Sequence, residues 1–200
     1  MQRQNVRKLT LAAMLGAVAF ILMFFSFSVP VLSPFADFDF SYLPELIGGF
    51  ILGPAGALEI IVVKILLKIV FKGTSSMYTG ELQAFLLSVA YVLPAVLYYQ
   101  KHRTKRGALT SILLGCVCSV FTAVLTNMFI IFPFYMSFYN MNWDAIIGMC
   151  SALIPAIHNK LTLILFSILP FNILSRALTS IITMLIYKKI SVPLKKMIMS

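Results

Sequence analysis

Long apolar runs separated by short polar stretches occupy almost the whole chain of 200 residues. Hydrophobic residues make up 60% of the sequence and charged residues only 11%, which is too apolar for the surface of a soluble domain of this size. A helix that crosses a bilayer needs about 20 mainly apolar residues, so a chain of this length has room for about six crossings. We therefore expect an integral membrane protein.

The predicted fold is all-α: a single membrane domain, residues 1–200, built as a bundle of about six transmembrane helices. The expected spans, in chain order, are 9–29, 42–53, 55–71, 82–99, 108–131 and 161–187. Gly53 and Pro54 separate two short or tilted helices by a tight turn. Pro170 lies within the last span, where it predicts a kink. The longest connection, 134–158, is rich in aromatic residues and is expected at the membrane interface.

Basic residues gather at the N-terminal tail, at residues 101–106 and at the C-terminal tail. This distribution is the positive-inside pattern, and an even number of spans places both termini on one side, so we expect both termini in the cytoplasm. The net charge of +10 does not indicate nucleic-acid binding, because the basic residues are not interleaved with aromatic residues on a water-facing surface. The expected location is the cell membrane, with the chain crossing it several times.

Signatures of catalysis or ATP hydrolysis are missing from the sequence. His102 and His158 lie in different loops, and the cysteines Cys116, Cys118 and Cys150 are interpreted as small core residues. The stretch FKGTSS at 71–76 lacks the Gly-Lys-Ser/Thr order of a phosphate-binding loop. We therefore expect no enzyme activity, no cofactor and no metal, and any energy for transport has to come from a partner or an ion gradient.

Two asparagines, Asn127 and Asn172, lie inside predicted spans. A polar side chain within a membrane is costly, so each is a candidate functional residue. A carboxamide offers an acceptor and two donors together, which suits the alternating carbonyl and N–H edge of a pyrimidine-like ring. The alternative is that each asparagine forms a hydrogen bond with a neighbouring helix.

Charged residues also occur in the apolar segments. Lys64 and Lys68 are four residues apart in the predicted third helix and so share a face. They could reach the headgroups or pair with Glu59. Arg176, one turn after Asn172, could pair with a carboxylate or with a ligand, and protein is the expected partner.

Aromatic residues crowd the half of the chain expected to face outward. They could form a stacking lid over a flat ring or an ordinary interfacial belt. They are Phe35, Phe38, Phe40, Tyr42, Phe134, Tyr135, Phe138, Tyr139 and Trp143. In the first span, Ala13, Gly16 and Ala17 place small residues at helical spacing, which permits another helix to approach closely.

The order of these features resembles the S components of energy-coupling factor (ECF) transporters, and among them the riboflavin type. The segments that carry the resemblance are KLTLAAMLGAVAFILM at 8–23, DFSYLPELIGGFILGPAGALEIIVVK at 39–64, GELQAF at 80–85, TNMFIIFPFY at 126–135 and LPFN at 169–172. The chain departs from relatives at two places. Where relatives often read Gly-Glu-x-Ala-Asn-Phe, Gln83 and Ala84 precede Phe85, and where some carry a lysine three residues after the last asparagine, Ser175 precedes Arg176.

The resemblance implies capture of riboflavin from the extracellular side, in a pocket capped by the first outer loop. Delivery to the cytoplasm would need a transmembrane coupling protein and two cytoplasmic ATPase subunits. The implied substrate contacts are Asp39, Phe40, Lys64, Glu81, Gln83, Asn127, Tyr135 and Asn172, and the implied partner-docking residues are Ala13 and Ala17. The alternatives are another vitamin or flat heterocycle as substrate, or a self-sufficient secondary transporter that uses Glu59, Lys64 or Arg176 for ion coupling.

Overall fold

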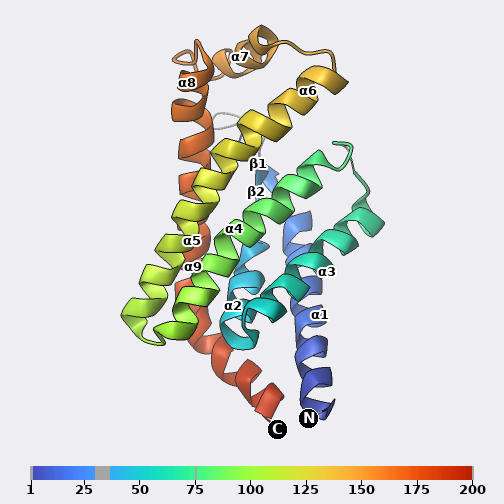
Figure 1. The fold of residues 1–200 in the computed structure, drawn as a ribbon, viewed down its shortest axis with the longest axis vertical. Coiled ribbons are helices and arrows are strands. Elements are labelled where there is room, and N and C mark those ends of the chain that lie inside the picture. The colour runs from blue at the N-terminus through green and yellow to red at the C-terminus, as the bar shows by residue number, and fades with distance from the viewer. Residues whose placement is uncertain (1, 30–36, 75, 200) are drawn as a thin grey trace.

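The chain folds as a bundle of helices (Figure 1). The structure is a computed structural model that describes residues 2–29, 37–74 and 76–199. Within these residues, four helical segments are long and apolar enough to cross a membrane: Gln4–Phe24, Thr79–Lys101, Arg106–Phe138 and Lys160–Tyr187. The helical fold predicted from the sequence is confirmed, and the chain begins and ends at the same end of the molecule (Figure 1).

The helical elements follow one another with short connections. In chain order they are α1 (Gln2–Phe24), α2 (Tyr42–Leu52), α3 (Pro54–Lys72), α4 (Thr79–Lys101), α5 (Lys105–Thr126), η1 (Asn127–Ile131), α6 (Phe132–Phe138), α7 (Trp143–Ser151), α8 (Lys160–Leu163), η2 (Ile164–Ile168) and α9 (Leu169–Met199). The elements η1 and η2 are π-helical turns that continue the helices on either side of them.

A short β-ribbon interrupts the helical pattern between α1 and α2. Strand β1 (Phe27–Ser28) pairs antiparallel with β2 (Asp37–Phe38), with Phe27 opposite Phe38. The sequence analysis did not anticipate these strands within the first outer loop. Residues 30–36 of that loop, which include Pro34 and Phe35, lie outside the described residues.

Helices α2 and α3 differ from the four long segments. Helix α2 has 11 residues, and at 1.5 Å per residue it is about 16 Å long, roughly half of the hydrocarbon core of a bilayer. Gly53 turns the chain with a φ of 89°, a conformation suited to glycine, and Pro54 begins α3, where no backbone N–H is needed. Helix α3 has 19 residues and carries four charged side chains: Glu59, Lys64, Lys68 and Lys72.

The helix of the fifth predicted span is longer than the sequence indicated. The fifth was expected to end near Pro133, but the helix passes through η1 and α6 to Phe138. Pro133 is the second residue after the π-helical turn η1, within this continuous helix. In the last span, where the sequence predicts a kink at Pro170, a π-helical turn ends two residues before this proline.

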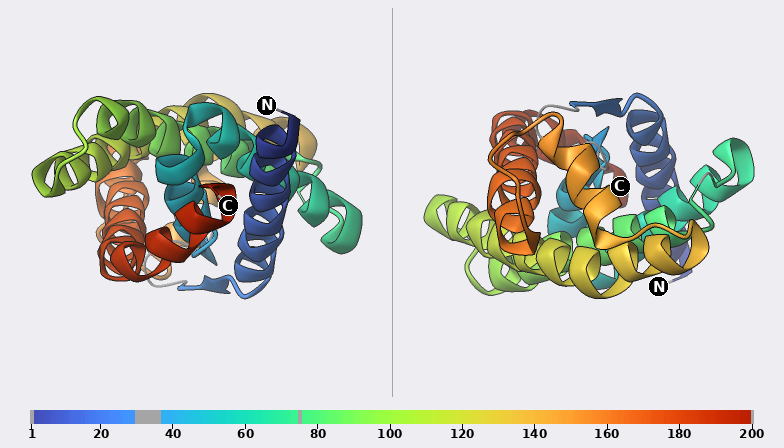
Figure 2. Two further views of the ribbon diagram at one scale, coloured as in Figure 1. Left: turned by 90° about the horizontal axis from the view of Figure 1, so that it is seen from below. Right: turned by 90° about the horizontal axis from the view of Figure 1, so that it is seen from above.

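Helix α2 forms the centre of the bundle, packed against α1, α3, α4 and α9 (Figure 2). Its buried side chains Leu46 and Phe50 meet Ile61 of α3 and Val92 of α4. Gly49 permits the close approach, since a Cβ there would lie 2.5 Å from Val96 Cγ2 of α4. Because α2 covers only the half of the bundle nearest the chain ends, space remains above its N-terminal residue Tyr42.

Candidate ligand-binding cavity

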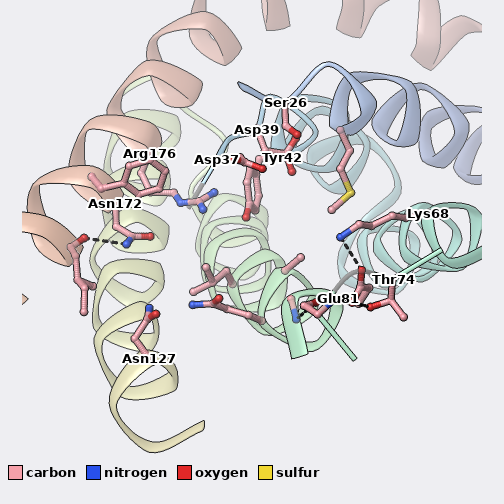
Figure 3. A pocket seen from close by; sticks show the side chains of 18 of the residues that line it. Ser26, Asp37, Asp39, Tyr42, Lys68, Thr74, Glu81, Asn127, Asn172 and Arg176 are labelled. Atoms are coloured by element: carbon pink, nitrogen blue, oxygen red, sulfur yellow. Dashed lines mark hydrogen bonds and ion pairs between the residues drawn. The ribbon is translucent and has the colours of Figure 1, made fainter. Parts of the chain in front are cut away.

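A cavity of about 410 Å³ lies above the N-terminus of α2, within the size range of small-molecule sites (Figure 3). Its polar lining comes from the α1–β1 connection, the β-ribbon and the residue after it, α3, the α3–α4 connection, α4 and the two helices that carry π turns. These residues are Ser26, Asp37, Asp39, Lys68, Lys72, Thr74, Ser76, Glu81, Gln83, Asn127, Ser167, Asn172 and Arg176. Apolar walls are added by Met23, Tyr42, Ala84, Leu87, Phe132, Leu163, Ile168 and Phe171.

The two buried asparagines enter the cavity from neighbouring helices (Figure 3). Asn127 begins η1, and its Nδ2 donates to the carbonyl of Ala123 at 2.7 Å. The Nδ2 of Asn172 donates to the carbonyl of Ile168, the last residue of η2, at 2.9 Å. Because a carbonyl oxygen can only accept, each amide nitrogen faces its own helix, and each Oδ1 remains as an acceptor. Each of these hydrogen bonds stays within its own helix. The alternative interpretation predicts hydrogen bonds to a neighbouring helix, which these are not.

Arg176 lies one turn beyond Asn172 and is only 3% exposed. Its guanidinium carbon is 3.6 Å from the ring centroid of Tyr42, so the two planar groups form a cation–π contact. The Nε and Nη1 atoms have no hydrogen-bond partner among the described residues. Burying a charged group without partners is costly, so these donors are available to a bound molecule.

Glu81 is held at the rim of the cavity by three side chains. Lys68 Nζ lies 2.8 Å from Glu81 Oε1, and the hydroxyls of Thr74 and Ser76 donate to Oε2 at 2.9 and 3.3 Å. These contacts tie α3 and the α3–α4 connection to the first turn of α4. The carboxylate is therefore fixed in place before any ligand binds.

Asp39 lines the opposite rim, where the chain leaves the β-ribbon and enters α2. Its Oδ1 accepts from the backbone N–H of Ser41 and its Oδ2 from the Ser41 hydroxyl, each at 2.7 Å. Asp37 accepts a hydrogen bond from the hydroxyl of Ser28 across the ribbon. A carboxylate oxygen has two lone pairs, so Asp39 can accept further bonds from a ligand.

The cavity brings together five of the predicted substrate contacts: Asp39, Glu81, Gln83, Asn127 and Asn172. Three others lie outside its described lining. Lys64 is fully buried in an ion pair with Glu45 of α2, Phe40 packs near Phe27, and Tyr135 packs against Tyr139. Sequence reasoning did not single out Thr74, Ser76 or Ser167 as ligand contacts, although Ser167 lies in a predicted span, where a polar side chain is itself a signal.

The lysines of α3 pair with other helices and not with Glu59, which is exposed. Lys64 contacts Glu45 of α2 and Lys68 contacts Glu81 of α4. Pairing with Glu59, one of the alternatives considered for these lysines, is therefore not what the structure shows. Lys64 and Lys68 face the interior of the bundle, where a carboxylate from another helix offsets the cost of burying each charge.

The small residues of α1 divide between two environments. Gly16 is buried, and a Cβ there would lie 2.6 Å from Val63 Cγ1, so it permits the contact between α1 and α3. Ala13 is exposed and Ala17 is half-buried. Gly16 therefore serves internal packing, whereas Ala13 remains accessible to another helix.

Fold and site together define a helical membrane protein built around a ligand-sized cavity of mixed polarity. The family model for the ECF transporter substrate-specific component matches residues 7–187, and the chain belongs to this family. This confirms the family indicated by the sequence motifs, and the chain is a multi-pass protein of the cell membrane.

Curated relatives match along nearly the full length. The chain is 29% identical to the riboflavin transporter RibU of Staphylococcus aureus over 194 residues, which cover 97% of this chain and 95% of the relative. It is 26% identical to the riboflavin transporter FmnP of Bacillus subtilis, with 93% of each chain covered. Among solved structures, it is similar to the S component described in "Structure and mechanism of the S component of a bacterial ECF transporter", with a TM-score of 0.75, 27% identity and coverage of 96% of this chain and 99% of that chain.

Proposed function

We propose that this chain is the riboflavin-binding S component of an ECF-type importer, which captures riboflavin from outside the cell. The observation that carries the proposal is the convergence on one cavity of about 410 Å³ of Asn127, the first residue of η1, and Asn172, one helical turn after the end of η2. π-helical turns recur at functional sites because they reorient side chains within an otherwise regular helix. The names of the relatives supply the substrate.

The chemistry of the flavin ring matches the groups that the cavity leaves open. One edge of the ring presents an N–H flanked by two carbonyls. An asparagine Oδ1 accepts from the N–H, and the donors of Arg176 serve a carbonyl. The apolar faces of the ring pack against side chains such as Phe132, Leu163 and Phe171.

The polar tail of riboflavin is a chain of hydroxyl groups, which the charged rim of the cavity suits. Asp39 and Glu81 lie at opposite sides of this rim as fixed carboxylates. A carboxylate accepts hydrogen bonds from hydroxyl groups and gains more from each than a neutral acceptor would. In this arrangement the buried amides form hydrogen bonds with the ring and the carboxylates form hydrogen bonds with the hydroxyl groups of the tail.

The proposal includes the membrane topology. Both termini and the basic loop at 101–106 face the cytoplasm, and α2 with α3 completes a set of about six membrane helices. The cavity then opens toward the outside, since the β-ribbon and the α3–α4 connection, which contribute to its lining, lie in the half of the bundle away from the chain ends (Figure 1). Cysteine labelling from outside intact cells tests this: the reagent should reach Met77→Cys in the α3–α4 connection but not His102→Cys.

Transport requires partners in this proposal. The sequence offers no phosphate-binding loop, so a transmembrane coupling protein and two cytoplasmic ATPase subunits supply the energy. Ala13 and Ala17 on α1 are the proposed docking positions for the coupling protein. Riboflavin uptake by vesicles that lack any ATPase would instead favour a secondary transporter.

Equilibrium dialysis of the purified protein against riboflavin tests the proposed function. Wild type should bind saturably, and a preparation from riboflavin-fed cells should be yellow. Asn127→Leu and Asn172→Leu should each weaken binding by about fivefold, the value of one neutral hydrogen bond. Asn5→Leu, at an exposed position of α1, is the matched control. Absence of saturable binding by folded wild type would refute the function.

A further inference from the structure

A polar network behind the cavity centres on Lys64, which is fully buried. Its Nζ forms the ion pair with Glu45 and donates to the hydroxyls of Ser41 at 3.1 Å and Ser88 at 2.9 Å. An ammonium group carries three N–H donors and no acceptor. All three donors are engaged within the protein, which is why Lys64 has none to offer a ligand.

The direction of each hydrogen bond in this network is set by what its members can donate. A serine hydroxyl has one proton, and Ser41 and Ser88 both receive a bond from Lys64, so each must pass its own proton onward. Ser41 donates to Asp39 Oδ2 at 2.7 Å, and Ser88 donates to Glu45 Oε1 at 3.2 Å. The branch through Ser88 therefore stays within the ion pair, whereas the branch through Ser41 ends at the cavity.

We propose that Lys64 is a positioning residue that acts through Ser41 to orient the Asp39 carboxylate toward a polyhydroxylated part of the ligand. The ammonium fixes the Ser41 hydroxyl, whose proton then always points at Asp39 Oδ2. Oriented in this way, Asp39 presents its remaining lone pairs to the cavity at a constant angle. This inference rests on the proposed function, because the hydroxylated group is the ribityl tail of riboflavin.

Tyr42 connects Lys64 to Arg176, which also lines the cavity. Its ring centroid is 5.0 Å from Lys64 Nζ and 3.6 Å from the Arg176 guanidinium carbon. Lys64 thus contacts two of the residues that follow Asp39, Ser41 by a hydrogen bond and Tyr42 by its ring face. The Lys64 ammonium thus holds the segment 39–42 in position through Ser41 and Tyr42, although Lys64 itself does not line the cavity.

The test compares Ser41→Ala with Ser88→Ala. Each change removes one hydroxyl that accepts from Lys64 and leaves the ion pair with Glu45 in place, but only Ser41→Ala removes a donor to Asp39. Riboflavin Kd should rise about tenfold in Ser41→Ala, as expected for a lost hydrogen bond to a charged group, and should stay within about twofold of wild type in Ser88→Ala. Ser41→Cys, with a similar side chain but a weak donor, should behave like Ser41→Ala.

Lumiflavin, which has the flavin ring but a methyl group in place of the ribityl tail, separates positioning from general damage. Ser41→Ala should leave lumiflavin affinity unchanged, so the ratio of the two affinities should fall about tenfold. Adding Ser41→Ala to Asp39→Asn should cost nothing further, because both changes act on the same interaction.

Two results would overturn the inference. Equal weakening by Ser41→Ala and Ser88→Ala, or a parallel loss of lumiflavin and riboflavin binding, would show that the network has only a structural role. Folded wild type that binds lumiflavin and not riboflavin, or binds neither, would overturn the proposed function together with this inference. The wild-type measurement therefore tells the two failures apart.

Discussion

Replacing Lys64 by methionine should destabilise the protein far more than the same replacement at Lys68. Both lysines lie on α3 and each pairs with a glutamate of another helix. The side chains of Lys64 and Glu45 are 0% exposed, whereas that of Lys68 is 18% exposed. The comparison therefore varies burial while it keeps the helix, the substitution and the kind of partner constant.

The expected loss of stability depends on the hydrogen-bond partners that each glutamate keeps after its lysine is replaced. Without Lys64, Glu45 keeps the Ser88 hydroxyl at 3.2 Å, and its Oε2 has no partner among the described residues even in the intact protein. Removal of one partner from a buried ion pair costs about 3–5 kcal/mol. Without Lys68, Glu81 keeps the hydroxyls of Thr74 and Ser76, so the expected cost is about 1 kcal/mol.

Denaturant unfolding of ligand-free protein in detergent measures both free energies of unfolding. The double variant Lys64→Met with Glu45→Met should recover most of the loss, because an apolar pair of similar volume can replace a buried ion pair. Equal losses at Lys64 and Lys68, or a double variant as unstable as Lys64→Met alone, would refute the reasoning.

Three further changes test other parts of the structure. Gly16→Leu should lower the free energy of unfolding by about 1–3 kcal/mol, because its Cβ would meet Val63. Ala13→Leu should leave stability and riboflavin binding unchanged. It should lower ATP-driven uptake, as measured in proteoliposomes with the partner subunits. Gln83→Leu should weaken riboflavin binding by about fivefold, the value of one neutral hydrogen bond to the ligand. Ala84→Asn in that background, at the position where the family resemblance implies an amide, should restore binding; dialysis measures both. Arg176→Met should weaken riboflavin binding by about tenfold yet raise the thermal stability of ligand-free protein, since it removes a buried charge whose Nε and Nη1 have no hydrogen-bond partner in the described part of the chain.

The long helices and the two asparagines could be predicted because their signals are local. An apolar run of about 20 residues specifies a span by its length alone, and a carboxamide within such a run is unusual whatever surrounds it. The directions of the amides could not be predicted, since they depend on the backbone carbonyl that each side chain reaches, that of Ala123 for Asn127 and that of Ile168 for Asn172. No sequence pattern signalled the π-helical turns η1 and η2 either.

The pairing of the charged residues could not be predicted because it is not local. Glu45 and Lys64 are on different helices joined at Gly53, and their contact depends on how closely α2 and α3 pack. The sequence analysis considered only Glu59, which lies on the same helix as both lysines. It also grouped Lys64 with the substrate contacts, whereas the structure assigns its three donors to the protein.

Asn127, Asn172 and Arg176, which line the cavity, keep hydrogen-bonding capacity that the described residues do not use, whereas the Lys64 ammonium behind the cavity keeps none. The Lys64 ammonium, with all its donors engaged, belongs to the scaffold. The Nε and Nη1 donors of Arg176, which have no partner among the described residues, are expensive to leave unused away from water, and the Oδ1 atoms of Asn127 and Asn172 remain as acceptors. A ligand that supplies the missing hydrogen-bond partners removes this cost. The free energy that destabilises the ligand-free protein therefore contributes to the affinity for a ligand with matching groups.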